Sequence, residues 1–110
     1  MKKYLIIFFI FIFQFATAQY KDDISIVQFT ADFAESVSLK DFKNHNTFIF
    51  KIESDKKYFD KENVKVVPTI ILFHNGKEIK RIKANIMLEL PQDWSEKIAA
   101  EIDQILNNKF

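Results

Sequence analysis

Cysteine is absent from the 110 residues of this chain. Its absence excludes disulfide bonds, thiolate nucleophiles, cysteine-ligated metals and lipid attachment at a cysteine. Small exported domains often depend on disulfides, so a domain of that kind would have to be stabilised here by packing alone. Phenylalanine is abundant instead: the chain has 13 copies, and eight of them follow residue 18.

Turn-forming residues and long apolar runs are also scarce. The chain has one glycine and two prolines, and it contains no internal repeat, low-complexity segment or interdomain linker. The long apolar run lies at the N-terminus, where Lys2 and Lys3 precede Tyr4–Phe15 and the small residues Ala16-Thr17-Ala18 follow. This pattern predicts a signal peptide, residues 1–18, that is cleaved near Ala18. The alternative is a retained leader, although a spanning helix needs about 20 apolar residues.

Cleavage at this point would leave residues 19–110 as a single domain. A domain of roughly 90 residues is long enough for one hydrophobic core. Loss of Lys2 and Lys3 reduces the 16 basic residues to 14, against 15 acidic residues. Because this domain is nearly neutral and has no basic stripe, nucleic acid is not indicated as a partner, nor is an acidic membrane surface. We expect an exported domain, periplasmic or secreted, that meets a membrane only if the leader is retained.

The clearest structural signal surrounds Pro68. The run Thr69–Phe73 is apolar and rich in β-branched residues, as in a strand that is buried on both faces. Asn75-Gly76 predicts a tight hairpin turn, with Lys77–Lys83 as the return strand. Proline cannot donate a hydrogen bond in a sheet, so Pro68 begins the strand or precedes it. A proline beside a buried strand also favours a cis peptide bond after Val67.

Two further strands and three helices complete the predicted elements. Ile24–Phe29 and Thr47–Ile52 are rich in β-branched and aromatic residues, which favours strands. Residues 36–43 are predicted as a helix, in which Ser38 and Asp41 fit a capping box. A short second helix would be capped by Ser54 or Asp55 and ended by Asn63. The last helix follows a cap at Asp93, and its apolar residues recur at helical spacing: Trp94, Ile98, Ile102, Ile105 and Leu106.

The order of these elements predicts an α/β fold. Two strand-helix-strand units indicate parallel pairing through right-handed crossovers, and the hairpin adds an antiparallel strand. A central mixed four-stranded sheet flanked by helices on both faces, in three α/β/α layers, is the natural assembly.

Two segments carry a resemblance to a known family. The stretch Val66–Gly76 resembles the cis-proline strand and hairpin of the thioredoxin family almost residue for residue. The stretch Val27–Phe33 resembles the strand and the segment that deliver the family's active-site loop. The resemblance spans about residues 24–106, with a first helix that is shortened. It implies that residues 19–110 form one thioredoxin-like domain.

The departures from the family bear directly on function. Where the family has Cys-Gly-Pro-Cys, this chain has Ala34-Glu35-Ser36-Val37. The family's buried aspartate corresponds to Gln28, which cannot titrate, and the glycine that faces the proline corresponds to Ala84. No catalytic role transfers to this sequence, so we expect a redox-inactive domain and not an enzyme.

The remaining polar residues offer weaker alternatives. Glu35 or Asp32 at a helix N-terminus would stabilise the first turn, in preference to binding a ligand. A Ser36 nucleophile would need His45 or His74 as its base, and both are expected at the far end of the sheet. The two histidines could share a metal, but no carboxylates have matching spacing. Trp94 could line a pocket, although its spacing favours the core.

We therefore predict a protein-binding or accessory module with no cofactor and no metal. In the family, the loop before the proline pairs with an extended peptide through backbone groups, which needs no sulfur. By resemblance, the groove would be bordered by Phe33, Ala34, Glu35, Ser36, Val67, Pro68 and Ala84. The expected partner is another exported or envelope protein, bound as an extended segment. The alternatives are a thiol-disulfide oxidoreductase, by similarity only, and a structural, membrane-tethered envelope subunit.

Overall fold

A computed structural model describes residues 19–108 of the chain. The predicted signal peptide, its cleavage site and the retained-leader alternative lie outside these residues. Within them, no helix combines the length and the apolar character needed to cross a membrane.

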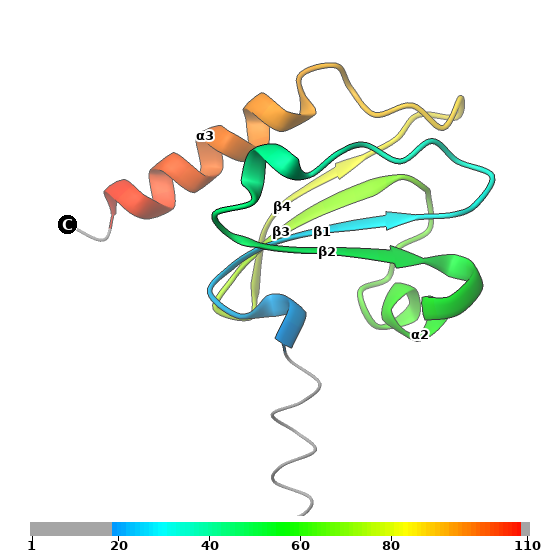
Figure 1. The fold of residues 1–110 in the computed structure, drawn as a ribbon, viewed down its shortest axis with the longest axis horizontal. Helices are drawn as coiled ribbons and strands as arrows, with labels where there is room; N and C mark the ends of the chain where they lie inside the picture. The colour runs from blue at the N-terminus through cyan, green and yellow to red at the C-terminus, as the bar shows by residue number, and fades with distance from the viewer. Residues whose placement is uncertain (1–18, 109–110) are drawn as a thin grey trace, which may run out of the picture.

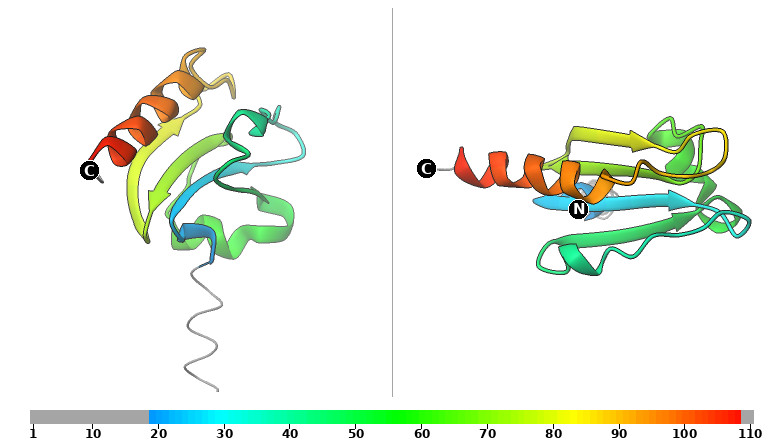
Figure 2. Two further views of the ribbon diagram at one scale, coloured as in Figure 1. Left: turned by 60° about the vertical axis from the view of Figure 1, so that its left-hand side comes forward. Right: turned by 90° about the horizontal axis from the view of Figure 1, so that it is seen from above.

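One mixed sheet of four strands forms the centre of the molecule (Figure 1). Its strands are β1 (Ile24–Thr30), β2 (Asn46–Lys51), β3 (Thr69–His74) and β4 (Lys77–Lys83). The spatial order is β2-β1-β3-β4, with β2 parallel to β1 and the other two pairs antiparallel. Helix α2 (Ile52–Lys61) covers one face of the sheet and α3 (Trp94–Asn107) covers the other, as Figure 2 shows from two further sides. The predicted α/β/α layers and mixed four-stranded sheet are confirmed.

The second of the two predicted parallel crossovers is wrong. Strand β3 runs antiparallel to β1 and therefore also antiparallel to β2. The C-terminal ends of β1 and β2 and the N-terminal end of β3 lie at the same end of the sheet, because Phe29 is in register with both Phe50 and Thr69. The connection through α2 therefore starts and finishes at the same end of the sheet. In a parallel crossover, the connection would have to run back along the sheet to its opposite end.

Helix α2 begins earlier than predicted and ends where predicted. It follows β2 without a loop and contains a break in helical geometry at Asp55, one of the two residues predicted as its cap. At its end Asn63 has a φ of 56°. The Val64 N–H donates to the Phe59 carbonyl (2.9 Å), and the Asn63 N–H donates to the Asp60 carbonyl (3.3 Å). These two bonds form a Schellman motif, which confirms the predicted termination.

The helix predicted over residues 36–43 does not form. Residues 35–39 have no regular secondary structure, and only the 3₁₀ turn η2 (Lys40–Phe42) follows them. Gln28 explains the difference. Its fully buried side chain accepts a hydrogen bond from the Val37 N–H (2.9 Å) and donates one to the Val37 carbonyl (2.8 Å). Because both backbone groups of Val37 are held by this amide, neither is free for a helical bond.

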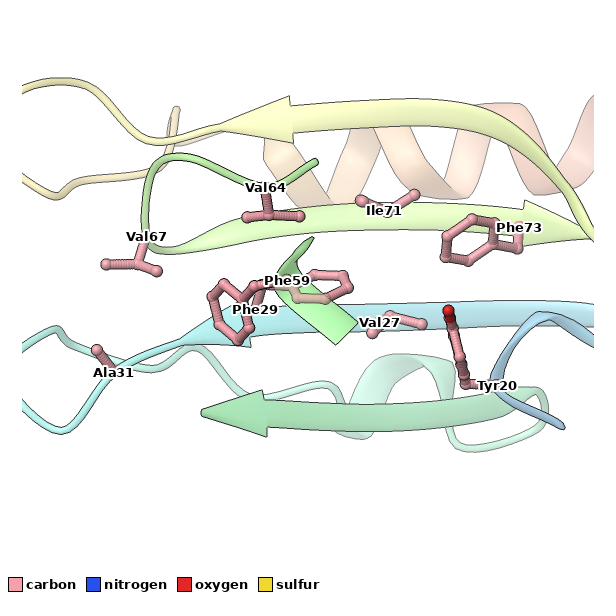
Figure 3. Packing of buried hydrophobic residues seen from close by; sticks show 9 residues of the cluster. All are labelled: Tyr20, Val27, Phe29, Ala31, Phe59, Val64, Val67, Ile71 and Phe73. Atoms are coloured by element: carbon pink, nitrogen blue, oxygen red, sulfur yellow. The ribbon is translucent and has the colours of Figure 1, made fainter. Parts of the chain in front are cut away.

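The core lies on both faces of the sheet because side chains alternate along β1 and β3. On the face of α2, side chains from β1, β3, α2 and the N-terminal 3₁₀ turn η1 (Gln19–Lys21) pack together (Figure 3). The cluster on the face of α3 contains Ile24, Ile26, Leu39, Phe42, Ile70, Leu72, Ile82, Ile98 and Ile102. The predicted apolar side of α3 is correct for Ile98 and Ile102, whereas Leu106 is 38% exposed. Asp93 precedes the helix as predicted, but its side chain makes no capping hydrogen bond.

Tyr20 in η1 anchors the start of the described chain. Its ring is buried and makes edge contacts with Phe50 and Phe73, at centroid distances of 5.3 and 5.9 Å. Its hydroxyl donates a hydrogen bond to Glu62, whose carboxylate also pairs with Lys21 (2.8 Å). Burial, together with the hydrogen bond and the negative charge of Glu62, raises the pKa of the Tyr20 hydroxyl above its ordinary value. The Tyr20 side chain is therefore a neutral phenol in the cluster on the α2 face.

Candidate functional site

Three loops meet at one end of the sheet. Residues 31–39 follow β1, residues 66–68 precede β3, and residues 84–93 follow β4. Their proximity follows from strand register, because Phe29 pairs with Thr69 and Thr69 pairs with Lys83. In Figures 1 and 2 the loops after β1 and β4 both lie beyond the arrowheads of these strands.

The loop before β3 is held firmly from both sides. The Val67-Pro68 peptide bond is cis, and both residues are buried. The Pro68 carbonyl accepts a hydrogen bond from the Ala84 N–H (3.0 Å), and the Thr69 hydroxyl donates to the Val66 carbonyl (2.7 Å). Within residues 19–108, the N–H and carbonyl of Val67 itself have no hydrogen-bond partner. One backbone donor and one acceptor are therefore unpaired at this point.

An open groove runs beside this loop. Its walls come from all three loops and from the start of α3, and its lining residues are Glu35, Val37, Pro68, Leu88, Glu89, Leu90, Pro91, Gln92 and Trp94. A second hollow adjoins the first, since both include Glu35, Leu88 and Glu89, and it extends to Phe33 and Met87. We call these two hollows together the proline groove.

The residues predicted to border the groove are only partly brought together. Glu35, Pro68 and Phe33 line it, and Ala84 lies in a neighbouring hollow that shares Glu89 with it. Ala34 is half-buried and packs against the cluster on the α2 face. The Ser36 hydroxyl points to Thr30, 3.4 Å away, and neither Ser36 nor Val67 lines the groove.

The structure corrects the expectation for Glu35 and shows where residues 34 and 37 lie. Glu35 does not sit at a helix N-terminus, because no helix begins between residues 34 and 39. The positions that correspond to the family's two cysteines are also separated. Ala34 packs against the cluster on the α2 face of the sheet, whereas Val37 packs against the cluster on the α3 face. The Gln28 amide that holds Val37 is the local cause of this arrangement.

The histidines lie away from the groove. His74 is in register with Ile24 at the start of β1, the opposite end from Thr30 and Ser36. His45 directly precedes β2, which begins opposite Ser25. Ser36 therefore has neither imidazole as a base. In the described part of the chain, no three histidine, aspartate or glutamate side chains gather as a metal would require.

The residues that sequence reasoning missed lie in the loop after β4, where Leu88, Glu89 and Leu90 form a wall of the groove. Trp94, the first residue of α3, fits both alternatives given for it, because it lines the groove and contacts Phe42 in the core (6.1 Å between ring centroids). The available signal was the apolar run Ile86-Met87-Leu88, which lies between a predicted strand and a predicted helix and belongs to neither.

The charged side chains that line the groove are all acidic. Glu35 and Glu89 line both of its hollows, and no lysine or arginine lines either one. Among residues 19–108, neither carboxylate forms an ion pair. The groove therefore presents negative charge beside an apolar floor.

Comparison with known proteins gives a match in fold alone. No family model and no curated protein matches the chain. Among solved structures, a mutant thioredoxin from Halobacterium salinarum superposes with a TM-score of 0.59 at 14% identity, over 77% of this chain and 80% of that one. Thioredoxin 1 of Thermosipho africanus gives 0.55 at 23% identity, over 76% and 96%. A thioredoxin of Schistosoma mansoni gives 0.58 at 16% identity, over 80% and 88%. The expected thioredoxin-like fold is confirmed, in a chain without cysteine.

Proposed function

We propose that this chain is an exported, redox-inactive thioredoxin-like module that binds an extended segment of another exported or envelope protein in the proline groove. The observation that carries this proposal is the groove lined by Pro68, together with the unpaired N–H and carbonyl of the neighbouring Val67. An extended peptide can pair with such groups as an added strand does, and its side chains then enter the adjoining hollows.

The geometry around Val67 favours binding because the groups involved are already fixed. The Pro68 carbonyl accepts a hydrogen bond from the Ala84 N–H, and the Thr69 hydroxyl donates one to the Val66 carbonyl. A loop that is held in one conformation loses little entropy when it binds a partner, so more of the interaction energy appears as affinity. Recognition of this kind requires backbone groups and shape, and it requires no sulfur.

The main rival function is thiol-disulfide exchange. The full sequence has no cysteine, so the protein has no side chain that could form the mixed disulfide which this reaction needs. Reduction of insulin by dithiothreitol in the presence of the protein should therefore proceed at the rate of a control without protein. Faster turnover would contradict the proposal.

Partner capture from the exported fraction tests the proposal directly. Ala34→Arg and Val67→Asp place charges at this end of the sheet, and both should remove captured proteins that the wild type retains. Ala100→Arg is the matched control because Ala100 is an exposed alanine on α3. Thermal melting should show that the variants are folded. If both variants capture the same partners as the wild type, partners do not bind beside residues 34 and 67, and the pairing proposed for Val67 is wrong.

The alternative of a membrane-tethered envelope subunit is tested at the predicted signal peptide and not at the groove. A membrane-tethered envelope subunit would retain residues 1–18 on its mature chain. Mass spectrometry of the native protein distinguishes the two readings, because a cleaved chain begins at Gln19 and a tethered one does not.

A further inference from the structure

Exposed apolar side chains gather at the mouth of the proline groove. Ile86 is 98% exposed, Met87 69% and Phe33 70%. Phe33 and Met87 line the same hollow although 54 positions separate them in sequence. We call these three residues the apolar tip. Isolated exposed apolar residues are ordinary, whereas here two of them share one hollow and Ile86 adjoins Met87 in the chain, a grouping that is typical of interaction sites.

The loop after β4, which carries Ile86 and Met87 of the apolar tip, is held in one conformation by hydrogen bonds. The Asn85 side-chain oxygen accepts hydrogen bonds from the N–H groups of Met87 (2.8 Å) and Glu89 (3.1 Å). The Asn85 N–H donates to the Glu89 carbonyl (2.9 Å), and the Leu88 N–H donates to the Asn85 carbonyl (3.0 Å). Leu88 adopts a φ of 62°, which is unfavourable for a residue with a large side chain. These bonds maintain the strained turn and project Ile86 and Met87 outward.

Charge then indicates what kind of segment fits. Glu35 enters the groove from the loop after β1 and Glu89 from the loop after β4. Both are without an ion pair among the described residues, and no cation lines the groove. A ligand that covers the groove removes water from these carboxylates, which is costly unless the ligand brings a positive charge. An anionic membrane surface would be repelled by the same two groups.

We propose that the proline groove selects an extended apolar segment that carries a lysine or arginine, with the basic side chain between Glu35 and Glu89 and the apolar side chains against the apolar tip. This inference rests on the proposed function and specifies the chemistry of its partner. The alternation of side chains along an extended segment allows apolar and basic residues to face different parts of one groove.

An array of immobilised nonapeptides tests the selectivity. Alternate positions are drawn from valine, leucine, isoleucine and phenylalanine, and the central position is lysine, arginine, glutamine or glutamate. Purified protein should favour the basic peptides over their glutamate counterparts by at least about fivefold, the effect expected of two exposed opposite-charge contacts. The doubly substituted protein Glu35→Gln with Glu89→Gln should lose this preference while its melting temperature stays unchanged.

Two further variants separate the parts of the inference. Ile86→Ser with Met87→Ser should weaken binding to all peptides equally, since it removes apolar contact and leaves the carboxylates in place. Glu96→Gln is the matched control for charge, because Glu96 is an exposed carboxylate on α3, and it should preserve the preference.

Each failure has a distinct meaning. Equal binding of basic and acidic peptides would overturn the charge selection and leave the binding function intact. Absence of binding to every peptide would overturn this inference and the proposed function together. Binding to phosphatidylcholine vesicles that the double serine variant loses, without binding to any peptide, would assign the apolar tip to a lipid surface instead.

Discussion

At the scale of single residues, the structure depends on polar side chains that are buried with matched partners. Tyr20 illustrates this, because its hydroxyl and the Lys21 ammonium share the carboxylate of Glu62. The sequence indicated neither contact, since 42 positions separate Tyr20 from Glu62 and Tyr20 falls in a segment that reads as polar. Burial of the ring beneath Phe50 and Phe73 is what makes the pairing strong.

The Tyr20 hydroxyl makes stability sensitive to alkaline pH. Its pKa is raised in the folded protein, so the folded state retains a proton that the unfolded chain releases above about pH 10. The contribution of this group is complete below that pH and is lost as the pH rises toward the folded-state pKa. Urea unfolding should show the free energy falling more steeply above about pH 10 in the wild type than in Tyr20→Phe.

The same variant has an expected cost at neutral pH. Tyr20→Phe removes one hydrogen bond to a buried carboxylate and keeps the ring, so it should lower the free energy of unfolding by about 1 to 3 kcal/mol. Parallel pH profiles for the wild type and Tyr20→Phe would show that the hydroxyl is not the group responsible.

At the scale of elements, strands were easier to predict than the first helix. The run in β3 is β-branched and apolar, so its burial on both faces follows from local sequence, whereas the β-branched and aromatic residues of β1 predicted a strand without settling its burial. Val37, Leu39 and Phe42 suggested a helix, but their spacing does not exclude an extended chain. The deciding contact is the amide of Gln28, nine positions away from Val37. A long-range hydrogen bond of this kind leaves no periodic signal in the sequence.

The role of the Gln28 amide can be tested by replacing its NH2 group with an oxygen. Gln28→Glu keeps the acceptor for the Val37 N–H but, when ionised, loses the donor to the Val37 carbonyl. Burial raises the pKa of such a carboxyl, so the variant keeps its stability while protonated and loses it as the pH rises. At neutral pH the free energy of unfolding should fall by about 2 kcal/mol, and hydrogen exchange at Val37 should accelerate.

Comparison with the wild type at each pH isolates this effect. The deficit of Gln28→Glu should shrink as the pH is lowered toward about 4, where an ordinary glutamate gains a proton. A deficit that is constant across the pH range would mean that shape, and not the missing donor, determines the cost.

In the candidate site, too, the features set by local sequence were predicted and those set by long-range contacts were not. The Pro68 strand and its hairpin were visible in the sequence, with Asn75 and Gly76 at φ values of 51° and 86° as such a turn requires. The wall formed by residues 84–91 was not, because its conformation depends on bonds to the Asn85 side chain and its position depends on β4. Sequence therefore located one side of the groove, and packing supplied the other.

At the scale of the whole molecule, the chain has a thioredoxin-like fold without cysteine and without the local environment that would activate a thiol. Low thiol pKa values arise at helix N-termini and beside positive charges. Here no helix begins between residues 34 and 39, and the neighbouring groove carries the carboxylates of Glu35 and Glu89. The absence of cysteine is thus matched by a backbone that would not activate one.

Introducing two cysteines tests this conclusion. In the double variant Ala34→Cys with Val37→Cys, the cysteines replace residues that pack against clusters on opposite faces of the sheet, which does not favour the close Cβ approach that a disulfide requires. We expect the thiols to stay reduced under mild oxidation and to titrate with an ordinary pKa of about 8.5. Insulin reduction should remain at the background rate. If the variant instead forms an internal disulfide and accelerates the assay, residues 34–37 can adopt the helical arrangement, and the contact between Gln28 and Val37 is too weak to prevent it.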